Sequence, residues 1–339
     1  AFASTMIAWH HFALYGPLSD LAMPAIGEMV RLFANYGRAT QIFFVVGGYV
    51  MARSMTGRAW GITQVGRYII HRYCRLGLPY LAAVALGIAA CAFGRGWLPS
   101  EVVDPPPTWN VILAHVFFLQ KLLGYDSFSA GLWFVCVNFQ LSLVFVGMLF
   151  VRDKLARFFP ATAVLMVMGW LMALPSLFYF NVGDEWSNWF IYFFPHFFLG
   201  VLVYYGLKSN GGQIVFGLYV LVIAMALVYT HTYTHVFRWR LQNTLIVGLI
   251  LFFGGKFGLM NTWPKSPVIG YLGKTAYSLF LVHFPIFVVV ATVWVMLGWT
   301  NPWAAVAGLV FAYIASLAAS FVFYRLVEVP AGRLSRKFN

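Results

Sequence analysis

Long apolar runs alternate with short polar stretches along nearly the whole chain. A helix needs roughly 20 mostly apolar residues to cross the hydrocarbon core of a bilayer. The pattern therefore predicts an all-α fold, a polytopic bundle of about ten transmembrane helices that forms one membrane domain over residues 1–339. The expected spans lie near residues 1–19, 39–52, 77–93, 131–151, 161–180, 190–207, 213–230, 241–255, 276–297 and 303–324.

Residues 108–123 also have a helical pattern, but they contain His115 and end near Lys121. We predict an interfacial or re-entrant helix for this stretch instead of a full span.

Composition supports a membrane location. The chain is 62% hydrophobic and only 9% charged, whereas soluble domains carry roughly 25% charged residues. A chain with so few charged residues could not cover itself with a polar surface. We therefore expect the lipid bilayer to surround it. The cysteines Cys74, Cys91 and Cys136 are scattered and suggest neither a disulfide framework nor a metal site.

The distribution of charge predicts the topology. The loop that carries Arg53, Arg58, Arg67, Arg72 and Arg75 contains no acidic residue. If this loop is cytoplasmic, ten spans put most of the 22 Lys and Arg residues on the same side, as the positive-inside rule requires. Both termini are then cytoplasmic, and we expect the cytoplasmic (inner) membrane of a bacterium. Orientation alone accounts for the net charge of +13, and no soluble domain remains to bind nucleic acid.

Two adjacent histidines interrupt the first apolar run, in TMIAWHHFALYGP over residues 5–17. His10 and His11 lie roughly 8–10 Å below the expected exit of this span at 1.5 Å per residue. Polar groups at such depth usually face the protein interior or a wet cavity. Adjacent helix positions diverge by about 100°, so the two rings cannot point to the same place. The pair is consistent with a catalytic base or with two structural histidines.

A basic motif, HRYCRLGLPY, occupies residues 71–80 at the cytoplasmic mouth of the third span. Arg72 and Arg75 are spaced i, i+3, so on a helix they would form a fork able to bind a polyphosphate. No acidic residue occurs between residues 29 and 100. The arginines therefore act either as membrane anchors or as ligands for an external anion.

Six segments resemble, in order, the signatures of the acyltransferase family 3 integral membrane proteins. They are IFFVVGGYVMARS (42–54), RYCRLGLPY (72–80), GLWFVCVNFQLSLVF (131–145), HFFLGVLVYYG (196–206), LGKTAYSLFLVHFPIF (272–287) and FYRLVEVPAGRL (323–334).

The resemblance implies a functional histidine in the first span, eleven positions after an arginine. His11 precedes Phe12 and fits the family's His-Phe pair, and its arginine would fall before Ala1, where we expect the start to be trimmed. The chain also departs from the family pattern. Gln41 stands where an Asp is usual, Asn138 where a Glu is usual, and Gly47-Gly48 replaces Ser-Gly. Gln41 and Asn138 can supply hydrogen bonds but no proton transfer.

The resemblance, together with these residues, predicts an acyl-CoA-dependent O-acyltransferase. The expected donor is acetyl-CoA, and the expected acceptor is a hydroxyl of a carbohydrate or glycolipid of the envelope or of an exopolysaccharide. His11, supported by His10, would be the base, because histidine takes protons near neutral pH. The arginines expected to bind the donor are Arg72, Arg75, Arg67 and Arg53. No metal is expected. The donor head and the base lie toward opposite faces, so a channel through the bundle is implied.

A proton-coupled transporter or flippase of a lipid-linked sugar is the alternative, with buried histidines as proton relays. Its weakness is that all nine acidic residues map to loops or span ends. A scaffold role is a third interpretation.

The remaining histidines and Cys74 are more consistent with structural roles than with catalysis or metal binding. His231 and His235 have a metal-like i, i+4 spacing but no third ligand nearby. His283 is expected to line a cavity more than to catalyse, and His196 to satisfy a helix break. Cys74, between two arginines, could form an acyl-cysteine, although a basic loop lowers many thiol pKa values without any use.

Overall fold

The computed structural model describes residues 2–36, 39–234, 239–260 and 266–338. Within these ranges the chain is helical and has no strand, and its one β-bridge joins Arg95 and Leu98. The predicted all-α class is therefore confirmed for the described chain. Contacts divide it into two compact units: unit 1 comprises Ala1–Ala39, Ile70–Cys136 and Lys265–Asn339, and unit 2 comprises Thr40–Ile69 and Val137–Pro264. The single domain over residues 1–339 stays a prediction, because compact parts of a helical bundle are not by themselves domains.

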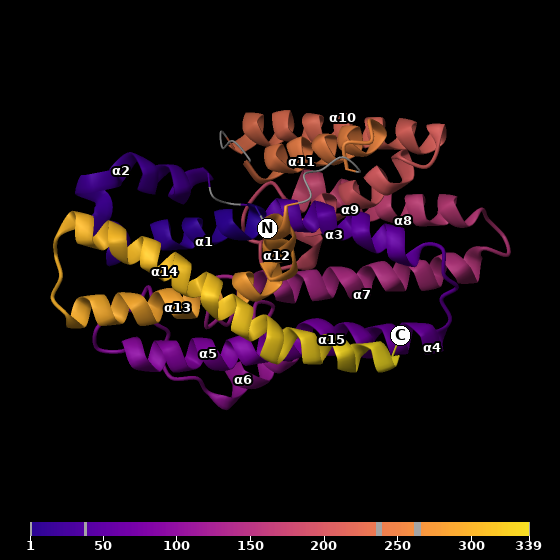
Figure 1. The fold of residues 1–339 in the computed structure, drawn as a ribbon. Helices are drawn as coiled ribbons and strands as arrows, with labels where there is room; N and C mark the ends of the chain where they lie inside the picture. The colour runs from indigo at the N-terminus through magenta and orange to yellow at the C-terminus, as the bar shows by residue number, and fades with distance from the viewer. Residues whose placement is uncertain (1, 37–38, 235–238, 261–265, 339) are drawn as a thin grey trace. The chain divides into compact units, whose positions relative to one another are not determined.

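In unit 1 the helix α13 is central and packs against α1, α5 and α14 (Figure 1). A continuous apolar core, which includes Phe12, Phe287 and Trp294, fills the space between these helices. The elements of unit 1 are α1 (Phe2–Leu14), α2 (Leu18–Tyr36), η1 (Tyr73–Gly77), α5 (Leu78–Gly94), α6 (Trp109–Val116), α12 (Pro267–Lys274), α13 (Ala276–Met296), α14 (Pro302–Phe323), η3 (Tyr324–Glu328), α15 (Val329–Ser335) and η4 (Arg336–Phe338).

In unit 2 the closest helix pair is α3 and α9. A Cβ atom at Gly48 would overlap the carbonyl oxygen of Phe197, and one at Gly200 would overlap that of Val45. Small residues let the two backbones approach this closely. The elements of unit 2 are α3 (Thr40–Met55), α4 (Ile62–Arg72), α7 (Leu132–Leu155), α8 (Ala161–Pro175), η2 (Ser176–Phe180), α9 (Phe190–Gly206), α10 (Asn210–Thr234) and α11 (Trp239–Lys256), of which α4 and α7 continue into unit 1.

Six helices of the described chain are long and apolar enough to cross a membrane: Ile62–Gly94, Leu132–Leu155, Ala161–Phe180, Asn210–Thr234, Ala276–Met296 and Pro302–Phe338. The other four predicted spans coincide with α1, α3, α9 and α11, which have 13, 16, 17 and 18 residues. The multi-pass character is thus confirmed, while a total of ten stays a prediction.

Three of the long helices contain a π-turn: η1 in the first, η2 in Ala161–Phe180 and η3 in the last. The turns η1 and η3 each end two residues before a proline, Pro79 or Pro330. A proline inside a helix has no N–H and its ring collides with the carbonyl group four residues earlier. A wider turn moves that carbonyl group away, which explains why both turns widen here.

The helix predicted over residues 108–123 is shorter in the structure, because α6 ends at Val116. Phe118 N–H donates to the His115 carbonyl at 3.1 Å, and Leu119 N–H donates to the Ala114 carbonyl at 2.8 Å. This pair of bonds is a Schellman motif. It requires the left-handed conformation at Phe118, whose φ is 57°, a position usually occupied by glycine.

Candidate active site

The buried histidines of α1 and α13 are in direct contact. Nδ1 of His11 lies 2.7 Å from Nε2 of His283, and the two rings are nearly parallel, with an interplanar angle of 10°. On its other side His283 places Nδ1 3.0 Å from the carbonyl oxygen of Leu279. His283 is fully buried and His11 is 9% exposed. The two rings and the Leu279 carbonyl thus form a chain through the core of unit 1.

Hydrogen-bond chemistry assigns the protons of this chain. A carbonyl oxygen can only accept, so Nδ1 of His283 donates to Leu279 and its Nε2, in the neutral ring, accepts. His11 must then donate through Nδ1. Nε2 of His11 is left with a lone pair, which is what a general base needs.

His10 points to a different helix. Its Nδ1 lies 3.0 Å from the carbonyl oxygen of Phe33 on α2, and the residue is 7% exposed. The two neighbouring rings therefore diverge, His11 toward α13 and His10 toward α2. A bond to a backbone carbonyl fits a residue that holds α1 against α2.

The arginine pair of the sequence motif lies at the π-turn η1. Arg72 ends α4 and Arg75 lies inside η1. Because a π-turn is wider than an α-turn, residues i and i+3 diverge more than in the expected fork. Arg72 is half-buried, and Arg75 is exposed.

The fold gives this pair an acidic neighbour that is distant in sequence. Arg75 is close enough to Glu328 of η3 for a charge interaction, and Ser278 Oγ donates to Glu328 Oε2 at 2.6 Å. On the same end of α13 the Tyr277 hydroxyl donates to the Leu76 carbonyl at 2.9 Å. The arginines are therefore less isolated from acids than their sequence neighbourhood indicates.

One helix connects the two parts of the site. Tyr277 and Ser278 contact the arginine end, and His283 follows about 8–9 Å further along α13 at 1.5 Å per residue. The sequence predicts that His283 lines a cavity, and it does not predict the pairing with His11 that the structure shows. The segment LGKTAYSLFLVHFPIF carries Tyr277, Ser278 and His283, but it does not report the contact of His283 with His11.

The remaining predicted site residues belong to unit 2. Arg53 and Arg67 are both exposed there. Gln41 is buried on α3, and Asn138 lies on α7. A shared site that joins these residues to His11 stays a prediction.

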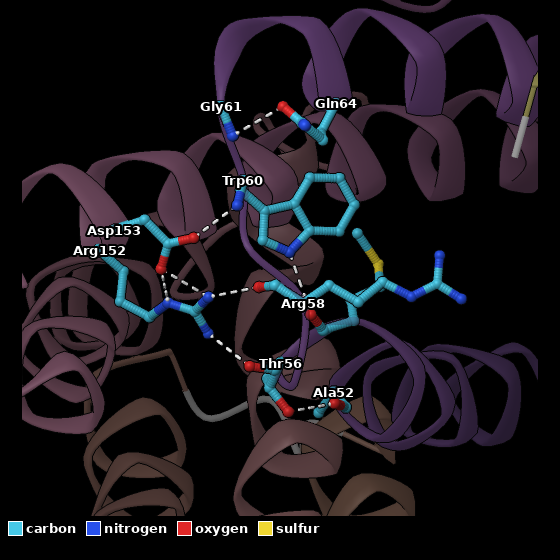
Figure 2. Close-up of polar contacts among 9 residues, drawn as sticks. Ala52, Thr56, Arg58, Trp60, Gly61, Gln64, Arg152 and Asp153 are labelled. Atoms are coloured by element: carbon cyan, nitrogen blue, oxygen red, sulfur yellow. Dashed lines mark hydrogen bonds and ion pairs between the residues drawn. The ribbon is translucent and has the colours of Figure 1, made fainter.

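Unit 2 has a basic pocket of about 690 Å³. Arg152 lies at its wall and donates to the carbonyl oxygens of Thr56 (2.9 Å) and Arg58 (3.0 Å), as Figure 2 shows. Its Nε lies 2.7 Å from Asp153 Oδ1, and Asp153 Oδ2 accepts the Trp60 N–H at 2.6 Å. Arg152 is thus fully engaged in holding the loop after α3.

The other histidines do not extend the site. Nδ1 of His196 pairs with Thr244 Oγ1 at 2.5 Å and joins α9 to α11. The carbonyl group of Ile191, which Pro195 leaves free, accepts from Ser176 instead, so the role predicted for His196 at the helix break is wrong. His231 is exposed, and His235 lies outside the described residues. The described residues contain no group of three or more His, Cys, Asp or Glu that could hold a metal.

The apolar helices indicate a multi-pass membrane protein, and the core of unit 1 holds a hydrogen-bonded pair of histidines. The chain matches the model of the acyltransferase domain family over residues 1–325. It belongs to acyltransferase family 3 and is a membrane acyltransferase. No curated protein and no solved structure matches it.

Proposed function

We propose that this protein transfers an acyl group, most simply acetyl, from acyl-CoA to a hydroxyl of an envelope or exported carbohydrate. The observation that carries the proposal is the hydrogen-bonded chain His11–His283–Leu279, which leaves Nε2 of His11 as a proton acceptor.

The proposed transfer uses this free nitrogen as the base. Nε2 of His11 takes the proton of the acceptor hydroxyl as its oxygen attacks the thioester carbonyl. The tetrahedral intermediate collapses, the C–S bond breaks, and the CoA thiolate leaves and takes the proton from His11. The imidazolium formed in between keeps its Nδ1–H bonded to His283, whose ring is oriented by Leu279. This neutral chain stands in for the carboxylate that orients histidine in many hydrolases.

Arg72 and Arg75 are proposed to bind the phosphates of acyl-CoA from the cytoplasm. Arg67 and Arg53, which belong to unit 2, stay predicted ligands of the donor. Charge-assisted hydrogen bonds to phosphate are about twice as strong as neutral ones. Glu328 is close enough to Arg75 to offset part of the positive charge of the guanidinium.

The proposed topology has ten spans in one membrane domain, both termini in the cytoplasm, and a bacterial inner membrane. It rests on the excess of basic residues on one side. A cysteine introduced at Arg58 should react only from inside, and one at Thr234 only from outside, in a Cys74→Ser background. Labelling of position 58 by an impermeant reagent in intact cells would overturn this topology.

The activity is tested on purified protein in lipid nanodiscs with acetyl-CoA and a polysaccharide or glycolipid acceptor. We expect free CoA thiol to appear only when the acceptor is present. Absence of thiol release, with proton-dependent movement of a lipid-linked sugar in vesicles, would identify a transporter instead.

A further inference from the structure

Unit 1 contains a second polar cluster, formed by Tyr80 of α5, His115 of α6 and Gln120 of the following loop. All three side chains have 0% exposure. The rings of Tyr80 and His115 are stacked, with centroids 6.2 Å apart. The Gln120 side chain approaches the Tyr80 hydroxyl without forming a hydrogen bond of normal geometry.

Several polar atoms of this cluster have no hydrogen bond within the described chain: Tyr80 Oη, His115 Nε2, and Gln120 Nε2 and Oε1. A buried donor or acceptor that is left unsatisfied destabilises the folded chain. Native structures keep few such groups, and each one needs an explanation. Four of them in one place point to a partner from outside the chain.

The chemistry of the cluster is that of an amide-binding site. Nδ1 of His115 lies 2.8 Å from the Val111 carbonyl and must donate to it, so Nε2 is an acceptor. Burial lowers the pKa of His115, which keeps the ring neutral at pH 7. Gln120 offers a donor and an acceptor, and the Tyr80 hydroxyl can act as either. No atom of this set carries a charge, so the set suits a neutral ligand with N–H and C=O groups.

A strained backbone supports the cluster. Phe118 holds the left-handed conformation, which is a genuine outlier for a bulky residue. Its ring packs on Tyr80 with centroids 4.7 Å apart, and its carbonyl accepts from Cys136 Sγ at 2.6 Å. Strain of this kind collects at ligand sites, where the surroundings hold it in place.

The neighbours of the cluster contact segments that lead toward the arginines at one end and toward His283 at the other. Tyr80 follows Arg75 by about 7–8 Å along the helix. Phe118 also packs against Gly77, next to the Leu76 carbonyl that Tyr277 binds. At the other end of the loop, Gly131 packs on Phe280, one turn before His283 on α13.

We propose that the Tyr80–His115–Gln120 cluster binds the pantetheine arm of the acyl-CoA. This inference rests on the proposed function, which supplies the donor. The arm is uncharged and carries two amides, so it offers the N–H and C=O groups that the cluster lacks. With the phosphates at Arg72 and Arg75, an arm held here directs the thioester toward His11.

The test compares two probes, acetyl-CoA and adenosine 3′,5′-bisphosphate, which has the head group without the arm. Gln120→Leu and Tyr80→Phe should each weaken acetyl-CoA binding by about 5- to 10-fold, as the loss of one neutral hydrogen bond predicts. Binding of the bisphosphate should not change. The thermal midpoint of the ligand-free protein should stay the same or rise, because each substitution removes an unsatisfied buried group.

The matched control is Gln242→Leu, the same substitution at a glutamine of α11 in unit 2 whose Oε1 also has no hydrogen bond. It should bind both probes as the wild type does. Wild type should bind acetyl-CoA more tightly than the bisphosphate. If it does, and both Tyr80→Phe and Gln120→Leu still bind acetyl-CoA normally, the inference is wrong and the proposed function stands. Equal loss of both probes, or a thermal midpoint that falls with affinity, also overturns it. If wild type binds neither probe, the donor assignment itself fails.

Discussion

The two units each bury polar groups, but they satisfy them differently. In unit 2, every nitrogen of the Arg152 guanidinium meets an oxygen of Asp153 or of the loop that follows α3 (Figure 2). In unit 1, His11 has one nitrogen left to accept a proton, and the Tyr80–His115–Gln120 cluster has several atoms without a partner.

The difference separates two uses of a buried polar group. A network that closes on itself stabilises one backbone arrangement and has no capacity left for a ligand. A buried polar group without a hydrogen-bond partner destabilises the ligand-free protein, and this cost is recovered only when a ligand supplies the partner. Changes in unit 1 should therefore alter chemistry more than stability, and changes at Arg152 should do the reverse.

The largest effect is expected at His11. His11→Ala should lower the acyl transfer rate by about 10²–10⁴-fold, the usual cost of a lost general base, while acetyl-CoA still binds. His10→Ala should lower activity less, mainly through stability, because the carbonyl group of Phe33 loses its donor. Turnover is measured as thiol release per folded molecule. An active His11→Ala beside an inactive His10→Ala would assign the base to His10, and activity in both would leave His283 as the candidate.

Arg152→Leu tests the closed network. Removing one partner of a buried ion pair costs about 3–5 kcal/mol, and here the Thr56 and Arg58 carbonyls also lose their donor. We expect a large drop in the thermal midpoint, measured by intrinsic tryptophan fluorescence in detergent, with donor affinity of the folded fraction unchanged. Arg152→Lys should rescue part of the stability, since lysine lacks the planar fork. A stable Arg152→Leu variant that fails to bind acetyl-CoA would contradict the distinction between a stabilising network in unit 2 and ligand-binding groups in unit 1.

Arg72→Ala or Arg75→Ala should weaken acetyl-CoA binding by about 1.5–3 kcal/mol, the value of a charge-assisted hydrogen bond to phosphate. Lysine at either position should restore only part of it. Titration calorimetry in nanodiscs measures the effect, and adenosine 3′,5′-bisphosphate should lose the same amount. Normal binding by both folded alanine variants would make these arginines membrane anchors only.

The smallest effect is expected at Glu328. Glu328→Gln keeps an acceptor for Ser278 but removes the negative charge near Arg75. Partly exposed charge pairs contribute about 0.2–1 kcal/mol, so acetyl-CoA should bind more tightly by a factor between about 1.4 and 5. The matched variant Glu28→Gln, an exposed carboxylate paired with Arg31 on α2, should have no effect. Weaker binding by Glu328→Gln would mean that the carboxylate positions Arg75 more than it neutralises it.

Much of the fold could be predicted because apolar runs of sufficient length specify membrane helices by themselves. The pattern failed where local geometry depends on one unusual residue. Nothing in the letters around Phe118 indicates a left-handed turn, since no glycine stands there, so α6 was predicted too long. The π-turns η1 and η3 have only a weak sign in the sequence, the prolines Pro79 and Pro330, because a proline can also bend a helix without widening it.

The candidate site residues could be predicted only where they belong to a motif within one continuous segment. His11 and the arginine pair stand in recognisable local motifs. His283 is 272 residues from His11, and the side chains near Tyr80 come from three separate segments. Such contacts depend on how helices pack, and a single sequence does not report that packing.

The helix Pro302–Phe338 is 37 residues long, about 55 Å at 1.5 Å per residue, while the hydrocarbon core measures about 30 Å. A helix of this length either tilts or extends beyond the acyl chains, by roughly 25 Å if it stands upright. Its C-terminal part carries Arg325, Arg333, Arg336 and Lys337, which are drawn to the phosphates of anionic lipids. The basic end is thereby tied to one leaflet and sets the depth of the protein. In a thicker or thinner bilayer, the difference between helix length and hydrocarbon thickness is therefore expected at the opposite, uncharged end at Pro302. A change in lipid composition should alter the surroundings of that end first.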